Sequence, residues 1–243
     1  MFKVGKVSYA NTIPLFHKLK SFPIIEGVPS ELVNLLRNGE IQAGIVSSVE
    51  YFFFPERYLI LPNVSISSKE SVCSVKLFSR KPIEEIKNVN ITSDSLTSRY
   101  LLYYIFEEKF GFLPKEKKLS EAEAILLIGD EAMENERYHY VYPYVYDLGE
   151  EWYKFHKLPF VFALFLVRRD TDKISSKRLY KEVIESLNSF FKEVINSFER
   201  YKFYFTDCID YSLKEEHLRS LDIFFEYLSK RFKRKKPKLE FLK

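Results

Sequence analysis

The sequence has 243 residues, of which 46% are hydrophobic and 30% are charged. This balance excludes a disordered chain and allows one large or two small domains. The net charge is +4, but seven basic residues fall within residues 230–238, and the rest of the chain is net acidic. Because no nucleic-acid motif accompanies this tail, we interpret it as the solvated end of a terminal helix rather than a nucleic-acid or membrane contact.

The first elements in chain order alternate between strand and helix. Residues 6–9 have a strand pattern, and Pro14 falls in the first turn of the helix that follows, where its missing N–H costs nothing. A helix is predicted from Pro29 to Gly39, because glycine is common just after a helix. Residues 41–48 then form a short apolar strand that ends on two serines.

The alternation continues through the rest of the chain. Residues 89–95 predict a strand and a polar turn, and residues 96–111 an amphipathic helix. Residues 123–129 form a buried strand before a helix, and residues 160–169 a long apolar strand. Helices at about 175–199 and 212–234 close the chain. This order of elements predicts an α/β fold with strands buried on both faces.

Small polar clusters lie where four of these strands meet their helices. They are Asn11-Thr12, Ser47-Ser48, Thr97-Ser98 and Gly129-Asp130. Helix N-termini carry free N–H groups that favour anions, and ligands of open α/β sheets bind beyond the carboxyl ends of strands. The alternative is that these residues are ordinary helix caps. Four clusters at equivalent places favour a ligand rich in carboxylates.

The cysteines and histidines are too scattered to indicate a metal site. Cys73 and Cys208 belong to no C-x-x-C pair, so we expect neither a disulfide framework nor a zinc site. The four histidines share no H-x-x-x-H spacing. We therefore expect no metal.

The hydropathy of the chain favours a cytoplasmic protein. No apolar segment of the signal-peptide type follows Lys3 and Lys6. The most apolar run, residues 158–167, is half of the about 20 residues that a spanning helix needs. We expect no contact with a membrane.

Several motifs together resemble one enzyme family. The stretches "VGKVSYANTIPLF", "EGVPSELVNLLRNGEIQAGIVSSVEYF", "ITSDSLTSRYLL", "AILLIGDEAM" and "YVYDLGEEWYKFHKLPFVFALFLVRRD" resemble the chorismate dehydratases of the futalosine route to menaquinone, in register from about residue 4 to 170. The resemblance implies a periplasmic-binding-protein-like type II fold, in which two α/β lobes joined by two crossover segments enclose a cleft. It also implies that chorismate loses water to give 3-[(1-carboxyvinyl)oxy]benzoate.

On this resemblance, residues 1–83 and 162–243 form lobe 1, and residues 84–161 form lobe 2. The implied partner is the small molecule chorismate, with neither nucleic acid nor membrane, and the protein is a monomer or a homodimer. Because the product is aromatic, the reaction has a large driving force, and no redox cofactor is expected.

The resemblance and the motifs together indicate the site residues. Asn11 and Asp130 are the candidate catalytic residues. Asn11 is expected to bind the substrate near its C4 hydroxyl or a carboxylate, unless it only caps a helix. The C3 proton is removed either by Asp130 or by the side-chain carboxylate of the substrate. The expected substrate-binding residues are Ser8, Thr12, Ser47, Ser48, Ser74, Thr97, Ser98 and Gly129.

Two other functions remain open. One is a cytosolic ligand-binding protein of the same fold, although solute-binding proteins normally carry signal peptides. The other is the sister cyclase that forms 1,4-dihydroxy-6-naphthoate. That family has a Pro-Asn-Asp-Thr motif and a catalytic histidine, whereas this chain has Ala10-Asn11-Thr12 and Asp130 at the corresponding places.

Overall fold

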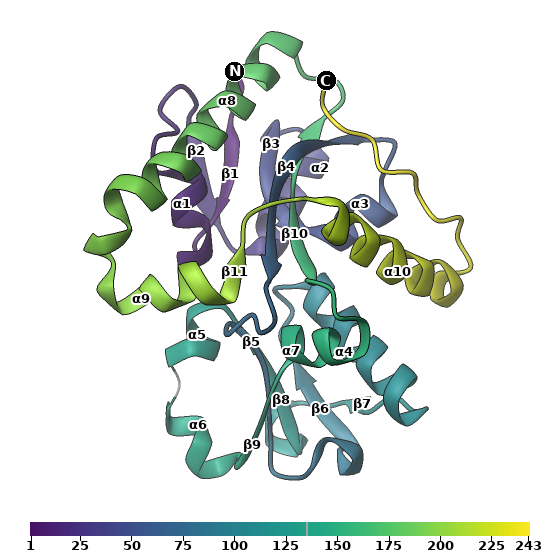
Figure 1. The fold of residues 1–243 in the computed structure, drawn as a ribbon. Coiled ribbons are helices and arrows are strands. Elements are labelled where there is room, and N and C mark those ends of the chain that lie inside the picture. The colour runs from purple at the N-terminus through teal and green to yellow at the C-terminus, as the bar shows by residue number, and fades with distance from the viewer. Residues whose placement is uncertain (135) are drawn as a thin grey trace.

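The structure is a computed structural model that describes residues 1–134 and 136–243. Two β-sheets organise the molecule, one in its upper part and one in its lower part (Figure 1). The first sheet has the order β11 (Ile209–Asp210), β4 (Tyr58–Ser68), β10 (Val161–Arg168), β3 (Ala43–Ser47), β1 (Val4–Val7) and β2 (Ile24–Gly27). The second has the order β7 (Lys115–Glu116), β6 (Asn88–Ile91), β8 (Ala124–Ile128), β5 (Val75–Ser79) and β9 (Tyr144–Asp147).

Helices pack around both sheets, which confirms the α/β class. The α-helices are α1 (Ile13–Phe16), α2 (Pro29–Asn38), α3 (Ser48–Phe53), α4 (Leu96–Phe110), α5 (Gly129–Glu134), α6 (Glu136–Val141), α7 (Leu148–His156), α8 (Lys173–Ser189), α9 (Glu199–Phe203) and α10 (Glu215–Phe232). Short 3-10 turns span Ala10–Thr12, Ile83–Glu85, Leu119–Glu121 and Ile195–Ser197, and π-helical turns span Phe190–Val194 and Tyr204–Cys208.

The start and end of α2 follow the sequence prediction. Pro29 opens the helix, and Gly39 ends it in the left-handed conformation with φ of 79°. The predicted start of α10 was less accurate. Its N-cap is Lys214, whose backbone N–H donates to Nδ1 of His217.

The chain crosses between the sheets twice, and the first crossing lies earlier than predicted. β5 pairs antiparallel with β8 and β9 and so belongs to the second sheet, although the boundary at residue 83 assigned it to lobe 1. The sequence of β5 is compatible with a place in either sheet, and only the strands with which it pairs show to which sheet it belongs. The crossover therefore ends at Ser74, and the second crossover leads into β10 at Val161, within one residue of the predicted boundary.

The two cysteines form a disulfide, so the expectation of no disulfide was wrong. Cys73 lies in the first crossover, and Cys208 ends the π-helical turn before β11. β11 pairs with the end of β4, where Ile209 lies opposite Ser68, and this pairing brings the two cysteines together across 135 residues of sequence. Because the two cysteines are so far apart in the chain, no local pattern in the sequence predicts the bond.

The C-terminal segment returns to the first sheet rather than extending into solvent. The N–H of Ile60 donates to the carbonyl of Glu240 at 2.9 Å, and Leu242 donates back to Ile60. Lys236 forms an ion pair with Asp222 at 2.6 Å. The basic tail therefore packs on the rest of the protein, and its Arg231 also forms an ion pair with Glu107 of α4 at 2.8 Å. The end of the chain is yellow in Figure 1.

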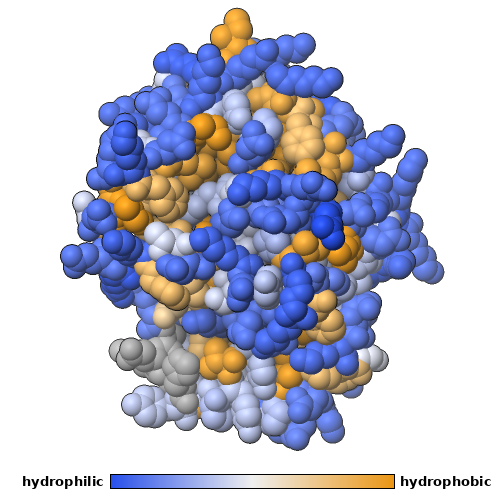
Figure 2. Space-filling view, in the orientation of Figure 1, coloured by the Kyte–Doolittle hydropathy of each residue, from blue (hydrophilic) through white to orange (hydrophobic). Residues whose placement is uncertain are grey.

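One apolar core runs through both lobes, because its buried residues come from strands of both sheets. Hydrophilic side chains cover most of the face in Figure 2, and apolar side chains form separate patches between them. None of the described helices has both the length and the apolar character that crossing a bilayer requires.

Candidate active site

A cavity of about 70 Å³ lies where the two sheets face each other. Side chains at the carboxyl ends of β1 and β3 line it from the first sheet, and residues around β5, β8 and α4 line it from the second. Of the predicted site residues, six line this cavity: Asn11, Thr12, Ser47, Ser74, Ser98 and Gly129. The site therefore lies beyond the ends of the strands, where α/β sheets bind their ligands.

The other four predicted residues lie outside the lining of this cavity. Ser8 is exposed and contacts the carbonyl of Gly27 at the edge of the first sheet. Ser48 and Thr97 are buried between the lobes, and Asp130 lies behind Gly129 at the start of α5. Their positions are close to the cavity but do not expose their side chains to it.

The described residues that line the cavity include no Asp, Glu, Lys, Arg or His. Its polar groups are hydroxyls and one amide, together with the phenol of Tyr9. Burial, with a smaller contribution from the nearby Asp94, raises the pKa of Tyr9 to about 12, so this phenol stays neutral. The cavity can donate and accept hydrogen bonds but has no charged acid or base of its own.

Asn11 lies at the centre of the polar groups. Its Oδ1 is buried and has no hydrogen-bond partner among the described residues. Its backbone carbonyl accepts from the hydroxyl of Tyr211 at 2.9 Å, which holds the residue in place. The 3-10 turn that contains Asn11 has no side-chain cap, so the capping alternative has no support. A buried amide oxygen without a protein partner is available to accept a hydrogen bond from a water molecule or a ligand.

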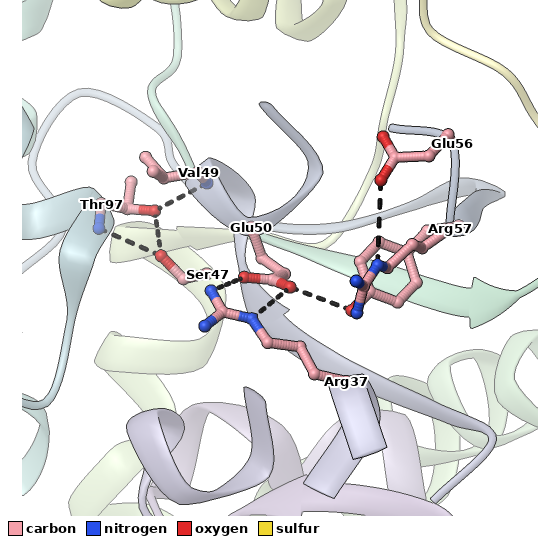
Figure 3. Close-up of polar contacts among 8 residues, drawn as sticks. Arg37, Ser47, Val49, Glu50, Glu56, Arg57 and Thr97 are labelled. Carbon is pink, nitrogen blue, oxygen red and sulfur yellow. Dashed lines mark hydrogen bonds and ion pairs between the residues drawn. The ribbon is translucent and has the colours of Figure 1, made fainter. Parts of the chain in front are cut away.

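Ser47 and Thr97 join the two lobes directly. Their hydroxyl oxygens are 2.5 Å apart, and the backbone N–H of Thr97 donates to Oγ of Ser47 at 3.0 Å. In return, Oγ1 of Thr97 accepts from the backbone N–H of Val49 at 3.3 Å. Figure 3 shows the reciprocal arrangement, in which each hydroxyl satisfies an amide at the start of the helix in the opposite lobe. We call this pair the interlobe latch.

The latch bears on the expectation that the polar clusters at helix N-termini bind carboxylates. The N-cap of α4 is Ser95, whose Oγ accepts from the N–H of Ser98 at 3.2 Å. The helix therefore starts at Leu96, as predicted, but Ser95 and not Thr97 or Ser98 caps it, and the amides of Thr97 and Ser98 already have protein partners. The backbone N–H of Val49 in α3 likewise has a protein partner, the hydroxyl of Thr97. In this closed arrangement, these amides are not free to bind a substrate carboxylate.

A buried ion pair supports the lobe 1 side of the latch. Glu50 in α3 is 1% exposed, and its carboxylate accepts from Nε of Arg37 at 2.9 Å and from Nη2 at 2.5 Å. The hydroxyl of Tyr58 donates to the same carboxylate at 2.9 Å. These bonds anchor α3 to α2 and β4 (Figure 3) and so fix the helix that begins at Ser48.

Asp130 makes a second contact between the lobes. Its Oδ1 accepts from the backbone N–H of Ala10 at 3.3 Å. Burial raises the pKa of Asp130, while the bond from Ala10 opposes that shift. The carboxylate therefore acts in the structure as an acceptor for the turn that carries Asn11.

Gly129 allows the lobes to approach closely. Its φ is 65°, and a Cβ at this position would lie 2.8 Å from the ring of Tyr9. Its N–H donates to the carbonyl of Ser74 at 2.8 Å. A side chain here would both strain the backbone and displace Tyr9 from the cavity.

Sequence reasoning missed the tyrosines around the site. The hydroxyl of Tyr204 donates to Oγ of Ser74 at 2.8 Å, and that of Tyr211 holds Asn11. Both come from the C-terminal region, which carries no distinct motif. No pattern of spacing marks them, because tertiary packing alone brings them to the residues that line the cavity.

A cluster of Asp210, Glu216 and His217 brings three groups of metal-ligand type together elsewhere. Nδ1 of His217 accepts from the N–H of Lys214, and Nε2 lies 3.2 Å from Asp210. Nδ1 is thus hydrogen-bonded by the protein and Nε2 faces the carboxylate of Asp210, and the cluster lies at the start of α10.

Comparison with known proteins agrees with this geometry. A family model described as menaquinone biosynthesis matches residues 2–230. A relative from Thermus thermophilus, named chorismate dehydratase, is 32% identical over 192 residues, which cover 69% of this chain and 70% of that protein.

Solved structures support the two-lobed fold. Protein AF1704 from Archaeoglobus fulgidus superposes with a TM-score of 0.73 at 17% identity, covering 95% of this chain and 97% of that one. The alkanesulfonate-binding protein SsuA from Xanthomonas axonopodis pv. citri superposes with a TM-score of 0.64 at 12% identity, covering 99% and 96%. The fold is periplasmic-binding-protein-like, as the resemblance implied.

Proposed function

Because the chain belongs to the menaquinone-biosynthesis family, whose members include chorismate dehydratases, we propose that it dehydrates chorismate to 3-[(1-carboxyvinyl)oxy]benzoate. The observation that carries the proposal is the unpartnered Oδ1 of Asn11, in an uncharged polar cavity between the lobes. The substrate combines a hydroxyl that can satisfy this oxygen with two carboxylates that accept from hydroxyl groups.

Asn11 steadies the departing C4 hydroxyl. In the reaction the C3–H bond breaks, its electron pair joins the forming aromatic ring, and the C4–O bond breaks. The hydroxyl leaves and takes up the proton that C3 has lost, so that one water is released. The buried Oδ1 accepts a hydrogen bond from the C4 hydroxyl and so holds the C–O bond that breaks in one orientation.

The side-chain carboxylate of the substrate takes the C3 proton. The absence of a carboxylate among the described lining residues supports this assignment over Asp130. Asp130 instead holds the turn that carries Asn11, through the N–H of Ala10. Thr12, Ser47, Ser74, Ser98 and Gly129 form the remaining substrate contacts.

The cavity is much smaller than the about 300–1,000 Å³ of typical small-molecule sites. The lobes therefore separate to admit chorismate and close over it. The latch between Ser47 and Thr97 stabilises the closed form, and Ser48 and Thr97 contribute to closure rather than to direct binding.

The test is incubation of purified protein with chorismate, followed by mass spectrometry and ultraviolet spectroscopy. We expect the mass of the substrate to fall by the mass of one water and the spectrum of a substituted benzoate to appear. Tight binding of chorismate without turnover over hours would instead support a ligand-binding protein. The cyclase is the weaker alternative, because no histidine side chain that the structure describes lines the cavity.

The futalosine route and a cytoplasmic location are parts of the same proposal. Disulfides are rare in the cytosol of most organisms but occur inside hyperthermophiles. The abundance of Lys and Glu and the single glutamine, Gln42, are compatible with a heat-adapted source. No metal or other cofactor enters the proposed reaction.

A further inference from the structure

We propose that Tyr204 is a positioning residue, which orients the hydroxyl of Ser74 toward the substrate. The inference rests on the proposed function, since it assigns a role in that reaction to a residue outside the matched motifs. Tyr204 is 5% exposed and begins the π-helical turn before β11. Such turns occur often at functional sites.

The contact between the two hydroxyls has a defined direction. The phenol of Tyr204 donates to Oγ of Ser74 at 2.8 Å. Burial raises the pKa of Tyr204 well above its usual range, so the phenol remains a neutral donor. Because Oγ of Ser74 accepts this bond, its own proton is available for another acceptor.

The protein provides only a weak acceptor for that proton. The carbonyl of Val72 lies 3.4 Å from Oγ of Ser74, which is long for a bond between a hydroxyl and a carbonyl. Ser74 also lines the cavity. A substrate oxygen is therefore the acceptor that the geometry favours, and the bond from Tyr204 strengthens Ser74 as a donor.

Two tyrosines that flank β11 connect Ser74 to Asn11. Tyr204 lies before β11 and donates to Ser74, while Tyr211 lies directly after β11 and donates to the backbone carbonyl of Asn11 at 2.9 Å. The short strand β11 therefore links the tyrosine that holds Ser74 to the tyrosine that holds Asn11.

The disulfide holds the same two segments together independently of this hydrogen bond. Cys73 precedes Ser74 directly, and Cys208 ends the turn that Tyr204 begins. The covalent link limits how far the phenol can move away from Ser74. The backbone of Cys73 is fixed further by its N–H, which donates to Asp147 at 2.6 Å.

The kinetic test is a double-mutant cycle. We expect Tyr204→Phe to lower kcat by about five- to tenfold with little change in KM, as for the loss of one neutral hydrogen bond made in the transition state. If Tyr204 acts through Ser74, the double variant with Ser74→Ala is no slower than Ser74→Ala alone. Tyr180→Phe is the matched control, because its hydroxyl contacts Asn63 on the surface. Multiplicative effects of the two substitutions would overturn the inference.

A spectroscopic test does not depend on turnover. In protein labelled with [13Cζ]tyrosine, the resonance lost in Tyr204→Phe identifies Tyr204. We expect Ser74→Ala to shift that resonance and Tyr180→Phe to leave it in place. An unshifted resonance would overturn the inference even if the enzyme is active. If the resonance shifts but the protein never dehydrates chorismate, the contact between Tyr204 and Ser74 is supported and only the proposed function is rejected.

Discussion

The hydroxyls of Ser47 and Thr97 meet 2.5 Å apart between the lobes, and each accepts a hydrogen bond from an amide at the start of the other lobe's helix. Closure thus satisfies helix amides that would otherwise need water or a ligand. The contact lies beside the cavity, since Ser47 lines it and Thr97 does not. The binding site and the closing contact therefore share one residue.

Thr97→Val should weaken substrate binding through lobe closure. The substitution leaves the N–H of Val49 buried without its acceptor, which costs about 1–3 kcal/mol. This cost lowers the fraction of closed molecules by about five- to hundredfold. The apparent KM rises by the same factor, while kcat changes less. Steady-state kinetics and small-angle scattering of the free protein measure both effects.

Thr206→Val is the control for the latch, because the Thr206 hydroxyl contacts the carbonyl of Lys202 at an exposed position. It should leave KM unchanged. An unaltered KM and radius of gyration in Thr97→Val would show that the latch does not control closure.

Asn11→Ala should abolish most of the activity while the fold is retained. Removing the group that orients the breaking C–O bond lowers kcat by about a hundredfold or more, with little change in KM. Asn63→Ala removes a surface amide and is the matched control. A fully active Asn11→Ala enzyme would contradict the proposed role.

Asp130→Asn separates the two candidate bases. If the substrate carboxylate takes the proton, the variant keeps its kcat within about threefold, since asparagine can still accept from the N–H of Ala10. The acid limb of the pH–kcat profile should also persist. A loss of about a hundredfold, together with disappearance of that limb, would instead identify Asp130 as the base.

The disulfide should contribute strongly to stability. In the chain-entropy account, a cross-link across a long loop restricts the unfolded state, typically by about 2–4 kcal/mol. Reduction with a dithiol should lower the free energy of unfolding in urea by about that amount. The variant Cys73→Ser/Cys208→Ser should not respond to the reductant. Two titratable thiols in the oxidised protein would show that the bond does not form.

Stability at low pH should depend on Asp210. Burial opposes its ionisation, but hydrogen bonds from His217 and Ser212 dominate and lower the pKa of Asp210 from 3.8 to about 2. A carboxyl with a lowered folded-state pKa stabilises the protein above its unfolded pKa, and this contribution is lost as pH falls from about 4 to 2. At pH 7, the free energy of unfolding of the wild type should exceed that of Asp210→Asn by about 2 kcal/mol.

The comparison of wild type and Asp210→Asn needs urea unfolding at several pH values. The two proteins should converge as pH falls toward about 2. Asp222→Asn is a control at a more exposed carboxylate. A difference that stays constant with pH would mean that Asp210 acts through packing rather than charge.

Local patterns in the sequence were enough to predict the α/β class, the helix from Pro29 to Gly39 and the polar turns that follow the strands. These features depend on residues near one another in the chain, such as a proline at the start of a helix and a glycine at its end. The same turns bring Asn11 and Ser47 to the lining of the cavity, because strand ends meet at one edge of a sheet.

Only the tertiary structure decided which groups remain free for a ligand. Thr97 and Asn11 look alike as polar residues at strand ends, yet Thr97 is paired with Ser47 and Asn11 keeps an unpartnered oxygen. The pairing of β11 with β4 brings Cys208 to Cys73, and the turn before β11 brings Tyr204 to Ser74. These contacts join residues more than a hundred positions apart, and their geometry arises from the packing of whole elements, which local sequence does not encode.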